Sequence, residues 1–304
     1  ATSYSNHNLT MIPFYIFYSM FGFQRIHDLA WAAGDAQAKG FLIGATSGRT
    51  TLNGEGLQHQ DGHSHILSST IPNCKSYDPA FGFELAVIIQ HGIKEMYEEK
   101  QNFFYYLTVT NERYLQPQKP KIKKVDEQII KGMYKFLSVS RPMIRLLGSG
   151  AILNECLKAH EILKQFDISS EVWSVTSFNM LRKDGMEIEN VNLKNPSKTP
   201  QASYVEQSFA HENIPAVAAT DYMRAYAEQI RPFVKGTYFT LGTDGFGRSD
   251  SRKKLREYFE VDANNIAATA AYALLQDQTI DKKQIGKIYE KLGINKDKSS
   301  PWVQ

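Results

Sequence analysis

Apolar residues in the first 116 positions alternate between runs of strand length and longer stretches with helical spacing. Aromatic and β-branched residues dominate the first apolar run, which is a composition typical of a strand. A polar, glycine-rich stretch at residues 46–64 predicts a long loop, and further along Asp78 precedes Pro79, the order typical of a helix N-terminus. The pattern predicts strands at residues 11–18, 41–44 and 103–109, and helices at residues 21–39 and 78–99.

The same alternation continues to the end of the chain. The pattern predicts strands at residues 143–147, 172–175, 216–219 and 238–241, and helices at residues 151–165, 220–233, 249–259, 262–276 and 281–292. Strands that alternate with helices form parallel sheets with helices on both faces. We therefore expect an α/β fold with two domains, the first of them incomplete at its N-terminus.

The sharpest change in composition lies at residues 113–125, which hold two prolines and five cationic side chains. Such a stretch is typical of a solvated linker. We therefore expect a first domain at residues 1–116, a linker at residues 117–128 and a second domain at residues 129–304.

Overall composition excludes several classes of protein. The 304 residues are 42% hydrophobic and 22% charged, as in an ordinary globular protein. The 35 basic and 32 acidic residues are too balanced to indicate a nucleic acid or an anionic membrane as partner. No apolar run approaches the roughly 20 residues that span a bilayer. The only two cysteines, Cys74 and Cys156, are far apart, which predicts neither a disulfide framework nor a thiolate metal site and fits a reducing compartment such as the cytoplasm.

The start of the chain carries neither a methionine nor a signal-peptide pattern. We therefore expect it to be a C-terminal piece of a longer protein or a processed chain.

Three histidines, His59, His63 and His65, lie in the glycine-rich loop together with Glu55 and Asp61. Loops that follow strands of an open α/β sheet are common ligand sites. The histidine spacing matches no standard zinc site, so we predict no metal there. The residues alone leave two interpretations equal: the histidines hydrogen-bond the loop, or one of them transfers a proton near neutral pH.

Three other features admit both a structural and a functional interpretation, and we favour the structural one for each. The aromatic side chains of residues 14–23 are expected to fill core, although one ring could stack on a flat cofactor. Gly148 and Gly150 fit a tight strand-to-helix turn as well as an anion site. In the loop at residues 242–250, Ser249 or Asp250 is expected to cap the next helix, although the loop could contact substrate or another subunit.

Four segments taken together resemble one family. They are YSMFGFQR at residues 18–25, TSGRTTLNGEGLQH at 46–59, DGHSH at 61–65 and LGTDGFGRSDSR at 241–252. They resemble the homodimeric bacterial type of pyruvate dehydrogenase, the decarboxylating, acetyl-transferring component of the pyruvate dehydrogenase complex. The resemblance covers essentially the whole chain and corresponds to the C-terminal third of the family's polypeptide. It implies a transketolase-like architecture, with the first domain part of the pyrimidine-binding middle domain and the second the C-terminal domain.

The resemblance also implies roles for four residues. Phe21 is similar to the ring that stacks on the aminopyrimidine of thiamine diphosphate, and Tyr18 to a tyrosine of the same pocket. Glu55 and His59 match the family's active-site glutamate and histidine. His59 would assist proton transfer or orient pyruvate and the incoming lipoyl group, which leaves His63 and His65 as structural residues of the loop.

The cofactors that the resemblance implies are thiamine diphosphate and Mg²⁺. The metal and diphosphate site, and the glutamate that activates the pyrimidine nitrogen, are expected on a preceding region, so we expect the isolated chain to be inactive. The implied partners are pyruvate, the lipoyl-bearing acetyltransferase component and a second copy of the chain. The alternatives are a transketolase-type ketol transferase, or a non-catalytic fragment for dimerisation and assembly.

Overall fold

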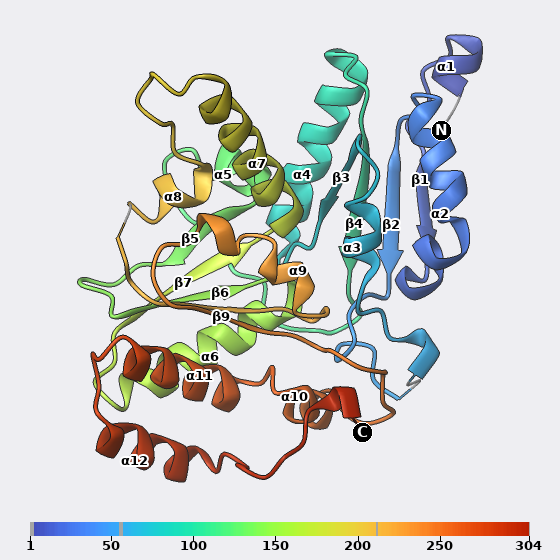
Figure 1. Ribbon diagram of the computed structural model, residues 1–304. Coiled ribbons are helices and arrows are strands. Elements are labelled where there is room, and N and C mark those ends of the chain that lie inside the picture. Colours follow the sequence, from blue (N-terminus) through green and yellow to red (C-terminus); the bar gives the residue numbers. More distant parts are fainter. Residues whose placement is uncertain (1–2, 55–56, 211, 304) are drawn as a thin grey trace.

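A computed structural model describes residues 3–54, 57–210 and 212–303, which form two β-sheets with helices on the faces of each (Figure 1). The first sheet holds β1 (Phe14–Phe17), β2 (Phe41–Ala45), β3 (Cys74–Tyr77) and β4 (Phe104–Val109), in the order β1-β2-β4-β3. The second holds β5 (Met133–Leu137), β6 (Ile144–Gly148), β7 (Ser170–Val175), β8 (Ala216–Ala219) and β9 (Tyr238–Leu241), in the order β5-β7-β6-β8-β9.

All neighbouring strands of the first sheet run parallel. In the second sheet only β5 is antiparallel to its neighbour, which makes that sheet mixed. The predicted α/β fold is therefore confirmed, and the sequence pattern missed two of the strands, β3 and β5.

Helices cover both faces of each sheet. On the first sheet, α2 (Ser19–Asp35) buries Phe23 and Ala30 against Phe104 and Tyr106, and the opposite face packs on α4 (Gly82–Ile93) through Ile88. On the second sheet, α6 (Leu153–Lys164) and α11 (Ala263–Gln276) pack on one face, while α7 (Phe178–Lys194) and α9 (Ala225–Glu228) pack on the other. The remaining α-helices are α1 (Ser3–His7), α3 (Ser64–Ser68), α5 (Val125–Lys131), α8 (Tyr204–Ser208), α10 (Arg252–Phe259) and α12 (Lys282–Leu292).

Three predicted helix starts are wrong, and each polar residue concerned makes a tertiary contact instead. Asp78 does not cap α4, which begins at Gly82 with the Glu84 carboxylate accepting from the main-chain N–H of Phe81 (2.9 Å). The predicted helix at 220–233 is reduced to the single turn of α9 and a 3₁₀ turn at Arg231–Phe233. Ser251, not Ser249 or Asp250, caps α10.

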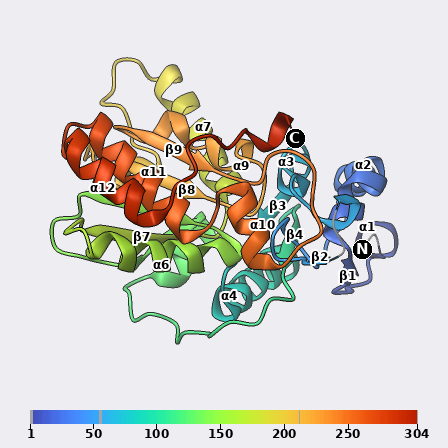
Figure 2. The same ribbon diagram turned by 90° about the horizontal axis from the view of Figure 1, so that it is seen from below.

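A buried polar junction joins the two sheets, whose arrangement Figures 1 and 2 show. The Asp78 N–H donates to the carbonyl of Thr176 (2.7 Å). The fully buried Glu84 of α4 accepts from Tyr134 Oη (2.7 Å) and Ser174 Oγ (2.6 Å), which both belong to the second sheet. These bonds hold the two halves in one arrangement, so a loop between them has a fixed frame on both sides.

Within the part of the chain described, no helix is long and apolar enough to cross a membrane.

Candidate functional site

Tyr18 and Phe21 lie where β1 ends and α2 begins. Tyr18 is the last extended residue before α2, and its carbonyl accepts from the N–H groups of Phe21 (3.0 Å) and Gly22 (3.1 Å). Gly22 is required for this close start, because a Cβ atom there would overlap the ring of Phe17. The turn therefore places two aromatic rings at the carboxyl end of a parallel strand, the usual position of ligands in such sheets.

His59 joins these two rings from the loop that follows β2. Its ring centroid is 5.2 Å from that of Phe21 in an edge-on arrangement and 6.1 Å from that of Tyr18. Tyr18 and Phe21 are 6.0 Å apart, and the guanidinium of Arg25 stands 4.3 Å from the Phe21 ring centre. We call Tyr18, Phe21 and His59 the aromatic cluster. The structure thus brings together three of the four residues predicted for the site.

Glu55, the fourth predicted site residue, lies outside the described residues.

The aromatic cluster is open rather than buried. Tyr18 is 47% exposed, and Phe21 and His59 are half-buried. Flat, partly exposed aromatic faces can receive another flat ring by offset stacking. The cluster can therefore hold a planar heteroaromatic group, with an imidazole beside it that is able to exchange a proton.

The start of the loop, directly after β2, is held by a carboxylate from the second sheet. Asp221 follows β8 and is buried. Its Oδ1 accepts from Thr50 N (2.9 Å) and Thr50 Oγ1 (2.7 Å), and its Oδ2 accepts from Thr51 N (3.2 Å) and Thr51 Oγ1 (3.0 Å). Burial raises the pKa of Asp221, while Arg256 and these hydrogen bonds oppose the shift. One side chain thus fixes two consecutive residues of the loop.

Arg49 crosses from the same loop to the glycine-rich segment after β9. Its Nη1 donates to the carbonyl oxygens of Thr243 (2.5 Å) and Gly245. The side chain is buried, and burial lowers its pKa against the opposing charges of Asp61, Asp221 and Asp244. The loop at 242–250, expected to cap a helix, therefore packs on the loop that carries His59.

His63 and His65 have contacts different from those of His59. The buried His65 shares a hydrogen bond with Thr108 Oγ1 (2.9 Å) and packs against Tyr222 and Tyr226, with both ring centroids 4.8 Å away. Burial lowers its pKa to about 3, so it is neutral near pH 7. His63 contacts Gln24, and burial lowers its pKa as well. Both make the contacts of residues that hold the loop in place.

Metal ligands do not converge in the described ranges: no group of three or more histidine, cysteine, aspartate or glutamate side chains there could hold an ion. Asp61 instead accepts from the N–H groups of His63 (3.0 Å) and Ser64 (2.9 Å), which shapes the turn into α3.

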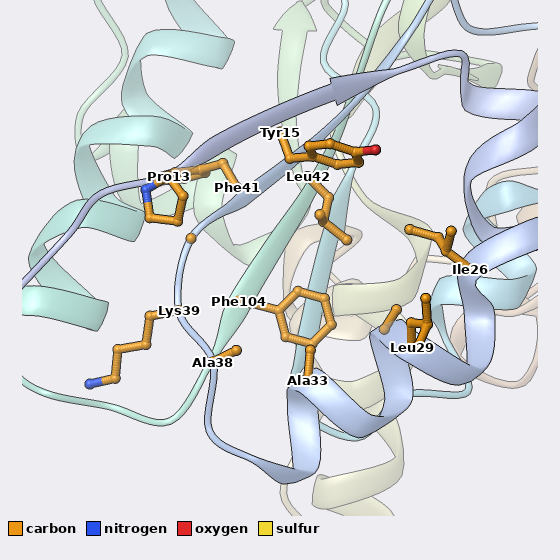
Figure 3. A pocket seen from close by; sticks show the side chains of 12 residues that line it. Pro13, Tyr15, Ile26, Leu29, Ala33, Ala38, Lys39, Phe41, Leu42 and Phe104 are labelled. Atoms are coloured by element: carbon orange, nitrogen blue, oxygen red, sulfur yellow. The ribbon is translucent and has the colours of Figure 1, made fainter. Parts of the chain in front are cut away.

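A separate apolar cavity of about 280 Å³ lies between α2 and the amino-terminal halves of β1 and β2 (Figure 3). Ile26 and Leu29 of α2 face Tyr15 and Leu42 across it. Lys39 contributes its alkyl stem, while its ammonium group donates to the carbonyl of Met96 (2.9 Å). The cavity lacks the convergent polar groups that chemistry needs, so the aromatic cluster remains the candidate site.

Sequence reasoning singled out the loop but missed the residues that shape it: Arg49, Asp221, and Gln60, whose side chain bonds to the main chain of Arg248. The position of Asp221, directly after a parallel strand, is the one signal that could have identified it. Nothing in the sequence shows which distant segment Arg49 or Gln60 would contact.

Solved structures with a similar fold include transketolases. A transketolase mutant from Pichia stipitis matches with a TM-score of 0.68 and 15% identity, over 88% of this chain and 35% of its own. The transketolase of Campylobacter jejuni matches with a TM-score of 0.66 and 17% identity, over 85% of this chain and 35% of its own. Identities this low define a class by fold alone: two transketolase-like α/β domains.

Sequence comparison identifies the family. The family model described as pyruvate dehydrogenase E1 component middle domain matches residues 1–117. The family model of the transketolase-like TK C-terminal domain matches residues 132–262. The pyruvate dehydrogenase E1 components of Pseudomonas aeruginosa and Escherichia coli K12 are 55% and 54% identical over 99% of the chain. The chain belongs to the family of pyruvate dehydrogenase E1 components. It spans about a third, 34%, of these relatives' length.

Proposed function

We propose that the protein of which this chain is part is a thiamine-diphosphate-dependent pyruvate dehydrogenase. It decarboxylates pyruvate and transfers the acetyl group to a lipoyl carrier on the acetyltransferase component. The observation that supports this most strongly is the aromatic cluster, because His59 lies beside Phe21 and Tyr18 although the chain separates them by some 40 residues. Two relatives named pyruvate dehydrogenase E1 component, with more than half of their aligned residues identical to this chain, support the same activity.

The described residues fit the aminopyrimidine ring of the cofactor. Phe21 would stack on that ring, and Tyr18 would line the pocket next to it. Arg25 lies against Phe21 and adds positive charge to the site, where an anionic substrate is expected. The bound cofactor would supply a carbanion and an electron sink for loss of CO₂.

His59 would act on the substrate rather than on the cofactor. An imidazole at the edge of Phe21 can donate a proton to an oxygen of the substrate, or to the sulfur that leaves when the disulfide of the incoming lipoyl group is opened. Glu55, four residues earlier in the same loop, is proposed to act with it on the basis of the resemblance.

The remaining parts of the active site are proposed to lie on the region that precedes this chain in its relatives. That region would hold Mg²⁺, the diphosphate and the glutamate that activates the cofactor. We propose residues 1–116 as the partial middle domain, 117–128 as the linker and 129–304 as the C-terminal domain. A homodimer in the cytoplasm, feeding glycolytic pyruvate into the complex, completes the proposal.

The test is His59→Ala in the full-length enzyme. We expect reductive acetylation of a lipoyl domain to fall roughly 100-fold, the size typical of a lost acid–base group. Binding of thiamine diphosphate should be unchanged, because Phe21 and Tyr18 remain. The control is His27→Ala on α2, since His27 contacts Thr70 (3.0 Å) and lies outside the aromatic cluster. An unchanged rate of lipoyl acetylation would refute the role of His59, and turnover of a sugar phosphate instead of pyruvate would indicate a ketol transferase.

A second candidate is supported by one solved structure. The chain covers 77% of a protein described as a split gene transketolase in an inactive β4 tetramer, with a TM-score of 0.63 and 13% identity. By analogy, the isolated chain would assemble without catalysing a reaction. Sedimentation of the isolated chain, together with a pyruvate decarboxylation assay with and without thiamine diphosphate, tests this candidate. Turnover by the isolated chain would contradict it.

A further inference from the structure

The residue next to His59 in the chain is tied to the second half of the molecule. Gln60 is fully buried. Its Nε2 donates to the carbonyl oxygens of Arg248 (2.8 Å) and Leu52 (2.7 Å), and its Oε1 accepts from Arg248 N (2.8 Å). The amide thus pairs with both main-chain groups of Arg248, as a strand would pair with its neighbour.

Further bonds join the same two segments on either side of this pair. Arg252 Nε donates to the carbonyl of Thr51 (2.8 Å), and Ser249 Oγ donates to that of Gly54 (3.0 Å). The N–H of Gly54 donates to the carbonyl of Asp250 (3.3 Å). Together with the Asp221 carboxylate, these contacts hold the loop at residues 50–54 and again at Gln60, the position after His59.

The first half of the molecule holds the loop mainly at its two ends. Ser47 N donates to the carbonyl of Val109 (3.0 Å), and Asp61 begins the turn into α3. Between these points, the described contacts of the loop main chain with other segments reach Asp221 and residues 248–252, which all belong to the second half. The place of His59 relative to Phe21 and Tyr18 therefore depends on residues nearly 200 positions away in the sequence.

We propose that Gln60 is a positioning residue for His59, and that the main chain of Arg248 and the carboxylate of Asp221 supply the frame against which it acts. The half of the chain built on the second sheet thereby takes part in the reaction without touching the substrate. This inference rests on the proposed function of His59. A displaced proton donor loses rate steeply, because the transfer needs hydrogen-bond distance to the reacting atom.

The experiment uses Gln60→Glu in the full-length enzyme, alone and combined with His59→Ala. Glutamate has nearly the shape of glutamine, but its carboxylate cannot donate to the Leu52 and Arg248 carbonyl oxygens. The matched control is Glu84→Gln, the reverse exchange at another buried position of the junction, which does not touch the loop. Asp221→Asn is the second variant and carries the same test should Gln60→Glu fail to fold.

We expect Gln60→Glu to lower the rate of lipoyl acetylation roughly 10- to 100-fold when His59 is present, and less than about twofold when it is alanine. The KM for the lipoyl domain and the affinity for thiamine diphosphate should stay within about twofold, and Glu84→Gln should leave the rate unchanged. Equal losses with and without His59, or a loss for Glu84→Gln as large as that for Gln60→Glu, would show a structural role and overturn the proposal. If His59→Ala alone has no effect, the proposed function of His59 fails first, so the two failures are distinguishable.

Discussion

The guanidinium of Arg49 lies directly against Gly62, so close that a Cβ atom at position 62 would overlap it. Arg49 cannot move aside cheaply, because it is buried and donates to the carbonyl oxygens of Thr243 and Gly245. The side chain of a residue at the start of the loop that carries His59 therefore packs directly on the end of the same loop. Position 62 needs a glycine because the Arg49 guanidinium leaves no space for a Cβ atom.

Replacing this glycine should loosen the whole loop. We expect Gly62→Ala to lower the free energy of unfolding by about 1–3 kcal/mol, as is typical of overpacking at a buried contact. The matched control is Gly286→Ala in the exposed part of α12, where a Cβ meets nothing within 4 Å. That substitution should stabilise the protein by about 0.5–1 kcal/mol. Urea denaturation of both variants measures the difference, and equal stabilities would contradict the crowding at Gly62.

His65 should make the protein sensitive to mild acid. Burial lowers its pKa to about 3 from the ordinary 6.5, so between these values the unfolded chain binds a proton that the folded chain does not. Stability is therefore fully present above about pH 6.5 and falls as the pH drops, by about 1.4 kcal/mol per pH unit. His65→Gln should reduce this dependence between pH 6.5 and 4. Denaturant midpoints of both proteins across that range measure it, and parallel curves would show that His65 is not the group responsible.

Asp78 should act in the opposite direction. Burial raises the pKa of its carboxyl group to about 7 from the ordinary 3.8, although the hydroxyl of Thr108 donates to it (2.7 Å) and favours the charged form. The folded chain therefore holds a proton that the unfolded chain has lost between about pH 4 and 7. The contribution to stability is full below about pH 4 and is lost as the pH rises through 7.

The test for Asp78 is its uncharged isostere. Asp78→Asn should gain stability relative to the parent as the pH rises from 5 to 8, because no charge is then buried at the junction. Thr108→Val provides a second check, since removal of the hydroxyl leaves the carboxylate with less support and should raise the pKa further. A stability difference between Asp78→Asn and the parent that stays constant with pH would contradict the shift.

The sequence predicted those residues of the site that stand in recognisable local segments. Tyr18, Phe21 and His59 stand in segments that resemble the family, and the strand-to-helix alternation placed those segments at the carboxyl ends of β1 and β2. What could not be predicted depends on contacts over long separations. Asp221 stands between a predicted strand and a predicted helix, where a carboxylate is expected to cap the helix. In the structure its carboxylate instead binds Thr50 and Thr51.

Two strands were missed because their own sequences show only a weak preference for a strand. β3, with the sequence CKSY, carries a charged and a small polar residue, and it is recognisable as a strand only through its pairing with β4. β5 lies at the edge of the second sheet and pairs with β7 on one side only. Its Lys135 forms an ion pair with Glu171 (2.6 Å). In both, tertiary packing outweighs the weak local preference for a strand.

The aromatic cluster gives the most direct test of where the cofactor binds. Phe21→Leu keeps an apolar side chain but removes the ring, so the affinity of the full-length enzyme for thiamine diphosphate should fall roughly three- to tenfold, the size of a lost stacking interaction. Trp31→Leu on the same helix is the matched control, because Trp31 is 49% exposed and lies outside the aromatic cluster. Titration of the apoenzyme with cofactor measures both dissociation constants. Equal dissociation constants for the two variants would mean that the aminopyrimidine does not stack on Phe21.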